Sequence, residues 1–244
     1  MIESGEGMPE ASRWRARLWA TVNAVLREPG FLTEEFLAGR RAQWLTPFGI
    51  CMSCATAYFG VGAAVSRIAS EPVVVSEQLP FPPEAQEALQ QMGARERLGD
   101  ERFTRMVSDA RALSLRLGKD IGDAVSLVML ILMPMFAALT WLAWRGVLGS
   151  YADHLVFAMH VHASLFASMA MAEVLSLVGS QTIAVLAGVG VLVYSTWYCA
   201  AAFKRVLGGT GAQLFVRSML VGITYGIWLT AALLSTAAYA LLTY

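Results

Sequence analysis

The fold of this chain depends on one stretch of sequence that carries all three of its histidines, Tyr151-Ala152-Asp153-His154-Leu155-Val156-Phe157-Ala158-Met159-His160-Val161-His162-Ala163-Ser164-Leu165-Phe166. The stretch opens a long apolar segment that also contains Glu173. Ionisable groups inside an apolar span are expensive to place there, and by default they mark a functional site. We therefore expect a membrane-spanning helix here and centre the search for function on it.

The composition of the whole chain is that of a membrane protein. Hydrophobic residues make up 57% of its 244 residues and charged residues only 15%, whereas soluble domains carry about 25% charged residues. The net charge is zero, so no overall electrostatic attraction favours nucleic acid, and we expect no nucleic-acid partner. The expected partners are the lipid bilayer and, beyond it, further copies of the chain or other membrane proteins.

Five apolar runs each have the length of about 20 residues that crosses a bilayer core. They predict transmembrane helices at 45–65, 124–144, 154–178, 183–203 and 214–242. Residues 66–122 show helical patterns at 84–92 and 101–117, and they predict a helical extracytoplasmic loop that is too small for a core of its own. The expected fold is an all-α, polytopic helical membrane bundle over residues 45–244. If the histidine-containing run did not cross, four spans would remain.

Residues 1–44 predict a cytoplasmic entry segment with an amphipathic helix. From Ser12 onward, apolar residues fall on one helical face and arginines on the other. Such a helix suits the headgroup layer of a membrane, and it equally suits packing on the protein's own surface. Pro29-Gly30 ends the helix, and Thr33 then has the position of an N-cap for a second, short helix.

Basic residues indicate how the chain enters the membrane. Arg40, Arg41 and Trp44 precede the first apolar run, a pattern typical of the membrane interface. Arginines and lysines in the short flanks gather on the side that holds the N-terminus. The positive-inside rule therefore predicts a cytoplasmic N-terminus.

Helical geometry divides the ionisable residues of the third run between two sides at about 100° per residue. Asp153, His160 and Ser164 share one side, His162 and Glu173 share the opposite side, and His154 lies between. One interpretation is structural, with Asp153 and His154 at the membrane interface and the other histidines hydrogen-bonded to neighbouring helices. The other interpretation is a pathway for protons or a polar substrate along these six residues.

A metal site is a further hypothesis for the same region. Two ligands on one helix need i, i+3 or i+4 spacing, which His160 and His162 do not have. The alternative joins Cys51 and Cys54 of the first run to His160. A haem held by two histidines within one subunit would need them on facing helices, and all three lie on one. We expect no cofactor, with a transition metal or haem as the alternative.

Glycines in the last run predict close helix packing. Gly222 and Gly226 form a GxxxG pattern, and Gly188 and Gly190 are equally small positions in the fourth run. Small residues let helix backbones approach in a membrane, so these glycines predict that the fourth and fifth spans pack together.

Three functions fit these observations. The chain has no Walker loop, HExxH, GxSxG or paired CxxC motif, and we expect a non-enzymatic transport, envelope or lipid-associated component with a polar site around the third span. The first alternative is a membrane redox protein that uses a metal or haem at the histidines, Cys51 and Cys54. The second alternative is a membrane scaffold that binds partners through its GxxxG span and its basic entry helix.

Several segments resemble a known family, the bacterial membrane proteins of domain-of-unknown-function family 3667. The resembling segments are Leu26-Arg27-Glu28-Pro29-Gly30, Phe36-Leu37-Ala38-Gly39-Arg40-Arg41 with Pro47, Pro134-Met135-Phe136-Ala137, and Tyr151 to Ala163. The resemblance implies a helical protein of the bacterial inner (plasma) membrane and no named biochemical role. Longer members carry a zinc-ribbon-like start that this chain lacks, so the resemblance implies no zinc ribbon here.

Overall fold

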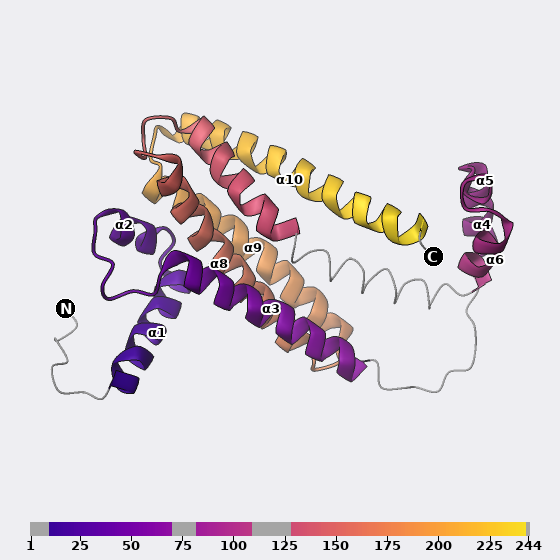
Figure 1. Ribbon diagram of the computed structural model, residues 1–244, viewed down its shortest axis with the longest axis horizontal. Helices are drawn as coiled ribbons and strands as arrows, with labels where there is room; N and C mark the ends of the chain where they lie inside the picture. The colour runs from indigo at the N-terminus through magenta and orange to yellow at the C-terminus, as the bar shows by residue number, and fades with distance from the viewer. Residues whose placement is uncertain (1–9, 70–81, 109–127, 243–244) are drawn as a thin grey trace. The chain divides into compact units, whose positions relative to one another are not determined.

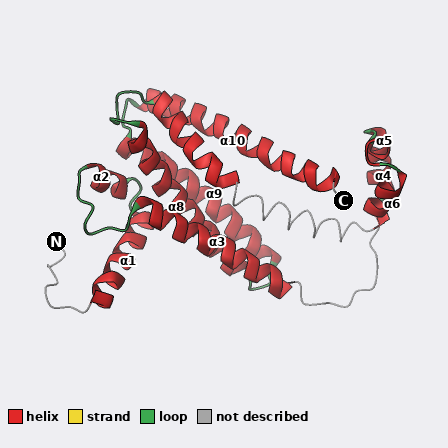
Figure 2. Ribbon diagram, in the orientation of Figure 1, coloured by secondary structure: helices red, strands yellow, loops and turns green. Residues whose placement is uncertain are grey.

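The described residues of the computed structural model, 10–69, 82–108 and 128–242, form helices joined by short turns (Figure 2). The one β-type contact among them is an isolated bridge between Arg145 and Leu148. The predicted all-α class is confirmed. The chain divides into two compact units, Met1–Ala69 with Ile131–Tyr225, and Ser70–Leu130 with Gly226–Tyr244.

Four described helices are long and apolar enough to cross a membrane. They are α3 (Pro47–Ala69), α8 (Tyr151–Ser176), α9 (Gln181–Val206) and α10 (Gly211–Leu242) (Figure 1). They correspond to the first, third, fourth and fifth predicted spans. The second predicted span is described as the shorter apolar helix Val128–Ala143, and its expected start at residue 124 lies outside the described residues.

Helix α8 is the centre of the first unit. It packs along α3 and α9, and both entry helices, α1 (Glu10–Arg27) and α2 (Phe31–Leu37), also contact it. Its buried face includes small side chains at Ala158, Ala163 and Ser164. Small side chains on a helix let neighbouring backbones approach closely in membrane proteins, which explains how four elements fit around one helix.

The predicted break between the two entry helices is confirmed, but the predicted N-cap of the second helix is wrong. Helix α1 ends at Arg27 before Pro29-Gly30, as expected. Gly30 itself is the N-cap residue of α2, with φ 78° and no side-chain cap hydrogen bond. The prediction that Thr33 caps this helix is wrong, because Thr33 lies inside α2 and its hydroxyl bonds elsewhere. A left-handed glycine starts the helix without needing a side-chain cap.

The glycines of the last two spans do not bring α9 and α10 together. A Cβ atom added at Gly188, Gly190, Gly222 or Gly226 would meet no atom of the described residues within 4 Å. The predicted close packing through these glycines is therefore not what the structure shows. Instead, α9 and α10 expose large apolar side chains such as Leu186 and Leu220, as expected for helices whose surroundings are lipid.

The second unit contains three short helices in the segment predicted to be a helical loop. They are α4 (Pro83–Gln91), α5 (Ala94–Leu98) and α6 (Asp100–Ser108). Arg95 joins α5 to α6 through an ion pair with Asp100 at 2.9 Å, and its guanidinium lies 5.4 Å from the centre of the buried Phe103 ring. The remainder of the predicted helix 101–117, beyond Ser108, lies outside the described residues.

Candidate functional site

Asp153 takes part in the start of α8. Ser150 is the N-cap, and its backbone N–H donates to Asp153 Oδ2 at 2.8 Å. The Asp153 N–H in turn donates to Ser150 Oγ at 3.4 Å. This reciprocal capping box satisfies two backbone donors at the positive end of the helix. Asp153 was grouped with a polar pathway from its sequence position, and the structure places its carboxylate in the helix cap instead.

His154 lies in the interior, although its position near the end of an apolar run predicted the interface. Its exposed fraction is 0%. Nδ1 lies 3.2 Å from Thr140 Oγ1 of the helix Val128–Ala143. Nε2 is buried and has no hydrogen-bond partner among the described residues. The burial follows from helix packing, because the helix before α8 folds back along it and covers its first turns.

His160 is bonded to the entry segment. Its Nδ1 atom lies 3.0 Å from Thr33 Oγ1 of α2, and both side chains are buried. Thr33 belongs to α2, which precedes the first apolar helix in the chain. Its hydrogen bond to His160 therefore places α2 against α8. The sequence singled out His160, but nothing in it indicated this partner.

His162 is bonded to its own helix and to α10. Its Nδ1 lies 2.8 Å from the Ala158 carbonyl oxygen, and its Nε2 lies 2.9 Å from the Tyr225 hydroxyl of α10. A carbonyl oxygen only accepts, so Nδ1 carries the proton, and in the neutral ring Nε2 accepts from Tyr225. Phe136 packs edge-on against both His162 and Tyr225. The prediction that His160 and His162 lie on different faces is confirmed.

The three histidines thus join α8 to three different elements. His154 contacts the helix before α8, His160 contacts α2, and His162 contacts α10. Each contact pairs an imidazole with a hydroxyl group and involves no charged side chain. Buried polar groups that find such partners avoid the desolvation cost of an unpaired group.

Tyrosines from α9 extend the polar surroundings of His160. Ser164 lies one turn after His160, and its hydroxyl donates to the Val161 carbonyl at 2.9 Å. The side chains of Tyr194 and Tyr198 lie near Ser164. Tyr194 also donates to the Leu26 carbonyl at 2.9 Å, and Tyr198 is only 2% exposed. We call Thr33, His160, Ser164, Tyr194 and Tyr198 the polar cluster. Sequence analysis missed the two tyrosines, although their i, i+4 spacing in an apolar helix was a visible signal.

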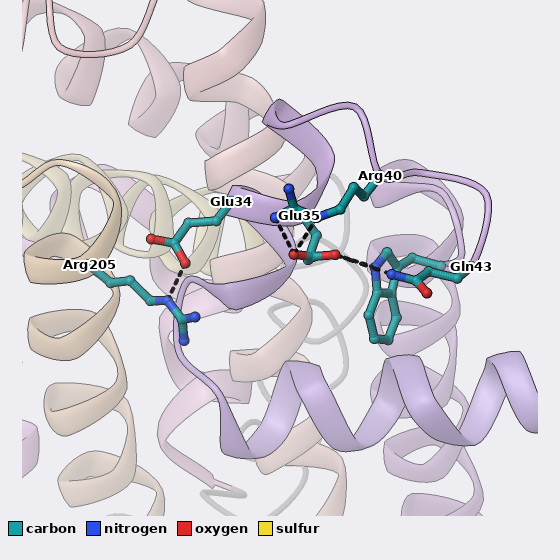
Figure 3. A network of polar contacts seen from close by, with 6 residues as sticks. Glu34, Glu35, Arg40, Gln43 and Arg205 are labelled. Atoms are coloured by element: carbon teal, nitrogen blue, oxygen red, sulfur yellow. Dashed lines mark hydrogen bonds and ion pairs between the residues drawn. The ribbon is translucent and has the colours of Figure 1, made fainter. Parts of the chain in front are cut away.

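A charged network holds α2 in place beside the polar cluster (Figure 3). The buried carboxylate of Glu35 accepts from Arg40 Nε at 2.9 Å, from Gln43 at 3.2 Å and from Trp44 at 3.4 Å. The hydrogen bond from Arg40 lowers the pKa of Glu35 below its ordinary value. Charge-assisted hydrogen bonds of this kind are among the stronger ones in proteins.

Two further contacts join α2 to the end of α9. Glu34 forms an ion pair with Arg205, whose guanidinium also lies 5.1 Å from the centre of the Phe31 ring (Figure 3). A Cβ atom at Gly30 would lie 2.8 Å from Val206 Cγ2. Gly30 is therefore required both for its φ angle and for the close approach of α2 to α9.

The three residues expected at the membrane interface have roles in this entry segment. Arg40 binds Glu35, and Arg41 donates from Nε to the Phe36 carbonyl at 3.1 Å. Trp44 packs edge-on against Phe31 with ring centres 5.5 Å apart. Their position at the interface stays a prediction, while their contacts show how they hold α2.

Glu173 lies apart from the histidines. It is half-buried on α8. It lies two turns after Phe166, on which Tyr58 of α3 packs with ring centres 6.1 Å apart. None of the described contacts of Glu173 reaches the polar cluster.

The residues of the metal hypothesis do not converge. Among the described residues, no three His, Cys, Asp or Glu side chains come together as a ligand set. Cys51 is buried and Cys54 half-buried on α3, whereas His160 is bonded to Thr33. The alternative combination of Cys51, Cys54 and His160 is therefore not a ligand set among the described residues.

Comparison with known proteins identifies one segment. Residues 15–59 match the model of DUF3667, described as a protein of unknown function. No curated protein and no solved structure matches the chain. The matched segment contains most of α1, all of α2 and the first half of α3, and so contributes Thr33 to the polar cluster and Glu35 to its supporting network. Over this segment, the chain is similar to the DUF3667 family of proteins of unknown function.

Proposed function

We propose that this protein is a non-enzymatic transport component of the membrane that passes protons or a polar solute through the polar cluster. The observation that carries the proposal is the buried contact of 3.0 Å between Thr33 Oγ1 and His160 Nδ1. It brings α2, the part of the family segment that lies before the first span, onto a histidine of another apolar helix.

The chemistry of the polar cluster supports passage rather than catalysis. Imidazole and hydroxyl groups both donate and accept hydrogen bonds, so neighbouring groups can exchange a proton without a charged side chain between them. Ionisable side chains such as histidine are rare inside membrane bundles, and where they occur they mark ion or substrate pathways. In this arrangement α2, part of the entry segment, packs against α8 at the polar cluster through Thr33.

A scaffold, whose histidines have only a structural role, is the second candidate, and one specific observation favours that structural role. Each histidine bonds α8 to a different element. Hydrogen bonds between membrane helices contribute about 0.6 kcal/mol on average, so the three together stabilise one arrangement around α8. In that case the histidines position helices and conduct nothing.

Proton flux in liposomes separates the two candidates. The purified protein is reconstituted with an internal pH-sensitive dye, and a potassium diffusion potential drives proton entry. We expect His160→Gln and Tyr198→Phe to abolish the flux, while His162→Gln, equally buried but outside the polar cluster, keeps it. If the wild type conducts no protons and all three variants lose thermal stability alike, the scaffold function is supported instead.

We also propose that the N-terminus is cytoplasmic, in the inner membrane of a bacterium. The Glu34–Arg205 pair supports this, because it joins the residues before α3 to the end of α9. Arg40, Arg41, Lys204 and Arg205 therefore lie at one end of these helices, and the positive-inside rule assigns that end to the cytoplasm.

The directions of α3 and α8 support five crossings. Thr33, before α3, lies at His160, whereas Tyr58 within α3 packs on Phe166 farther along α8. The two helices therefore run the same way, and the chain between them has to return across the membrane. Val128–Ala143 is the apolar helix in the described part of that stretch. With a cytoplasmic N-terminus, a C-terminal alkaline phosphatase fusion is expected to be active; a fluorescent C-terminal GFP fusion would contradict the combination of five crossings and a cytoplasmic N-terminus.

A further inference from the structure

Helix α1 has two halves with different surroundings. Its second half packs on the protein, where Thr21, Ala24 and Val25 are buried. Most of its first half is exposed, and the exposed fractions of Trp14 and Trp19 are 55% and 72%. Two large aromatic side chains on a projecting helix leave a wide apolar surface that no described residue of the chain covers.

Two hydrogen bonds place α1 at the level where the chain enters the apolar layer. Arg17 donates to the Trp44 carbonyl at 2.7 Å, and the Leu45 N–H donates to Thr21 Oγ1 at 3.3 Å. Trp44 and Leu45 lie immediately before α3, the first helix that can cross a membrane. In Figure 1, α1 leads away from the start of α3. A membrane crossed by α3 would therefore have its surface at the level of α1.

The charge of α1 is suited to an anionic surface. From Ala11 to Arg27 the helix has no acidic residue, and it carries arginines at positions 13, 15, 17 and 27. At about 100° per residue, Arg15 lies between Trp14 and Trp19 around the helix. Arg15 and Trp19 are on the side turned away from the packed residues, whereas Trp14 is in line with the packed residues but lies in the projecting half of the helix, where it is exposed. Guanidinium groups bind phosphate oxygens in bidentate geometry, and tryptophan prefers the level of the headgroups.

We propose that Trp14, Arg15 and Trp19 form a lipid-binding surface that docks onto anionic phospholipid headgroups of the membrane in which the protein resides. The arginine binds the headgroup phosphates, and the indole rings lie at the boundary between headgroups and acyl chains. Docking fixes α1, and through the Arg17 and Thr21 contacts it fixes the beginning of α3. This surface is separate from the polar cluster, so it holds whether or not the protein conducts protons.

Tryptophan quenching in nanodiscs tests the surface with the full chain. The protein is placed in discs of brominated phosphatidylcholine, with or without phosphatidylglycerol. The chain has 7 tryptophans, so the signal of interest is the difference between wild type and Trp14→Phe/Trp19→Phe. We expect that component to be quenched strongly only when phosphatidylglycerol is present. Both tryptophans are exposed, and the double variant should keep the thermal stability of the wild type.

Charge variants on the same helix provide the matched comparison. Arg15→Gln is expected to lower the ratio of docked to undocked helix about fivefold, the equivalent of about 1 kcal/mol for one basic residue at an anionic surface. Arg27→Gln, in the last turn of α1, should change it little. Equal quenching in both lipid mixtures would overturn the anionic preference. Absence of quenching, with a change of oligomeric mass in the double variant, would show that a second copy covers this surface.

Discussion

Thr33 Oγ1 and His160 Nδ1 lie 3.0 Å apart in the interior of the first unit, although 127 residues separate them along the chain. The contact joins α2, from the segment that matches the family model, to the histidine helix α8. Both side chains are buried, so neither could form a hydrogen bond with bulk water if its partner were lost. The position of α2 is therefore coupled to α8 through one hydrogen bond between neutral side chains.

Replacing Thr33 by valine should destabilise the protein. The substitution keeps the shape of the side chain but leaves His160 Nδ1 without its partner, a loss of about 1–3 kcal/mol for a buried polar group. Unfolding in mixed detergent micelles would measure it. Thr33→Ser, which keeps a hydroxyl, should recover most of the stability.

Thr196→Val is the matched control for that experiment. Thr196 is exposed on α9, and its hydroxyl donates to a carbonyl of its own helix, Leu192, at 2.8 Å. We expect little change from it. Equal stability of the Thr33→Val, Thr33→Ser and Thr196→Val variants would show that the Thr33–His160 bond contributes nothing to folding.

Gly30→Ala should displace α2 from α9 through a steric clash. Gly39→Ala is the control that separates this clash from backbone strain. Both glycines have positive φ, 78° and 82°, so each substitution costs about 1–2 kcal/mol from left-handed backbone alone. Only at Gly30 does the new methyl group collide with a neighbour, Val206 Cγ2 at 2.8 Å. Limited proteolysis within residues 28–46 should therefore accelerate for Gly30→Ala well beyond Gly39→Ala. Adding Val206→Ala should reverse part of that excess; the absence of any reversal would argue against the steric cause.

The Glu35 network should make stability depend on pH at its acidic end. The pKa of Glu35 is lowered from 4.5, chiefly by the hydrogen bond from Arg40, so the folded state holds the proton less tightly than the unfolded state. Its contribution is therefore fully present above pH 4.5 and declines as the pH falls through the lowered pKa. The melting temperature of the wild type should fall on acidification more than that of Glu35→Gln. Parallel pH curves for the two proteins would contradict the role of this carboxylate.

His162 and Tyr225 should show a measurable pairwise coupling. Tyr225→Phe removes the hydroxyl that lies 2.9 Å from His162 Nε2 but keeps the ring contact with Phe136. A double-mutant cycle with His162→Ala should give a coupling of about 0.6 kcal/mol, the average for such bonds in membranes. Additive effects of the two substitutions would show that the contact carries no energy of its own.

Some of the site was visible in the sequence, and some visible signals were overlooked. Helical spacing alone placed His160 and His162 on different faces, and their separate partners agree with it. The Ser150-x-x-Asp153 pattern of a capping box was present in the sequence and explains Asp153 better than a polar pathway does. The i, i+4 spacing of Tyr194 and Tyr198 likewise indicated that these two tyrosines share one face of their helix.

Other features could not be deduced from local pattern. Threonine is a residue type favoured at N-caps, yet because α2 packs on α8, the hydroxyl of Thr33 forms its hydrogen bond with His160. His154 has the sequence position of an interfacial residue, yet the neighbouring helix buries it completely. In both cases a contact between distant segments outweighs a local preference that amounts to about 1 kcal/mol or less.

The sequence by itself determined that this is a helical membrane protein, where four of its long helices lie, and which faces of α8 carry its histidines. Those properties follow from apolar length and from a period of 3.6 residues, both of which are local. The tertiary structure alone decided what each histidine bonds to: Thr140, Thr33 and Tyr225 come from three separate elements. Partner choice depends on which helices pack side by side, and no local periodicity contains that information.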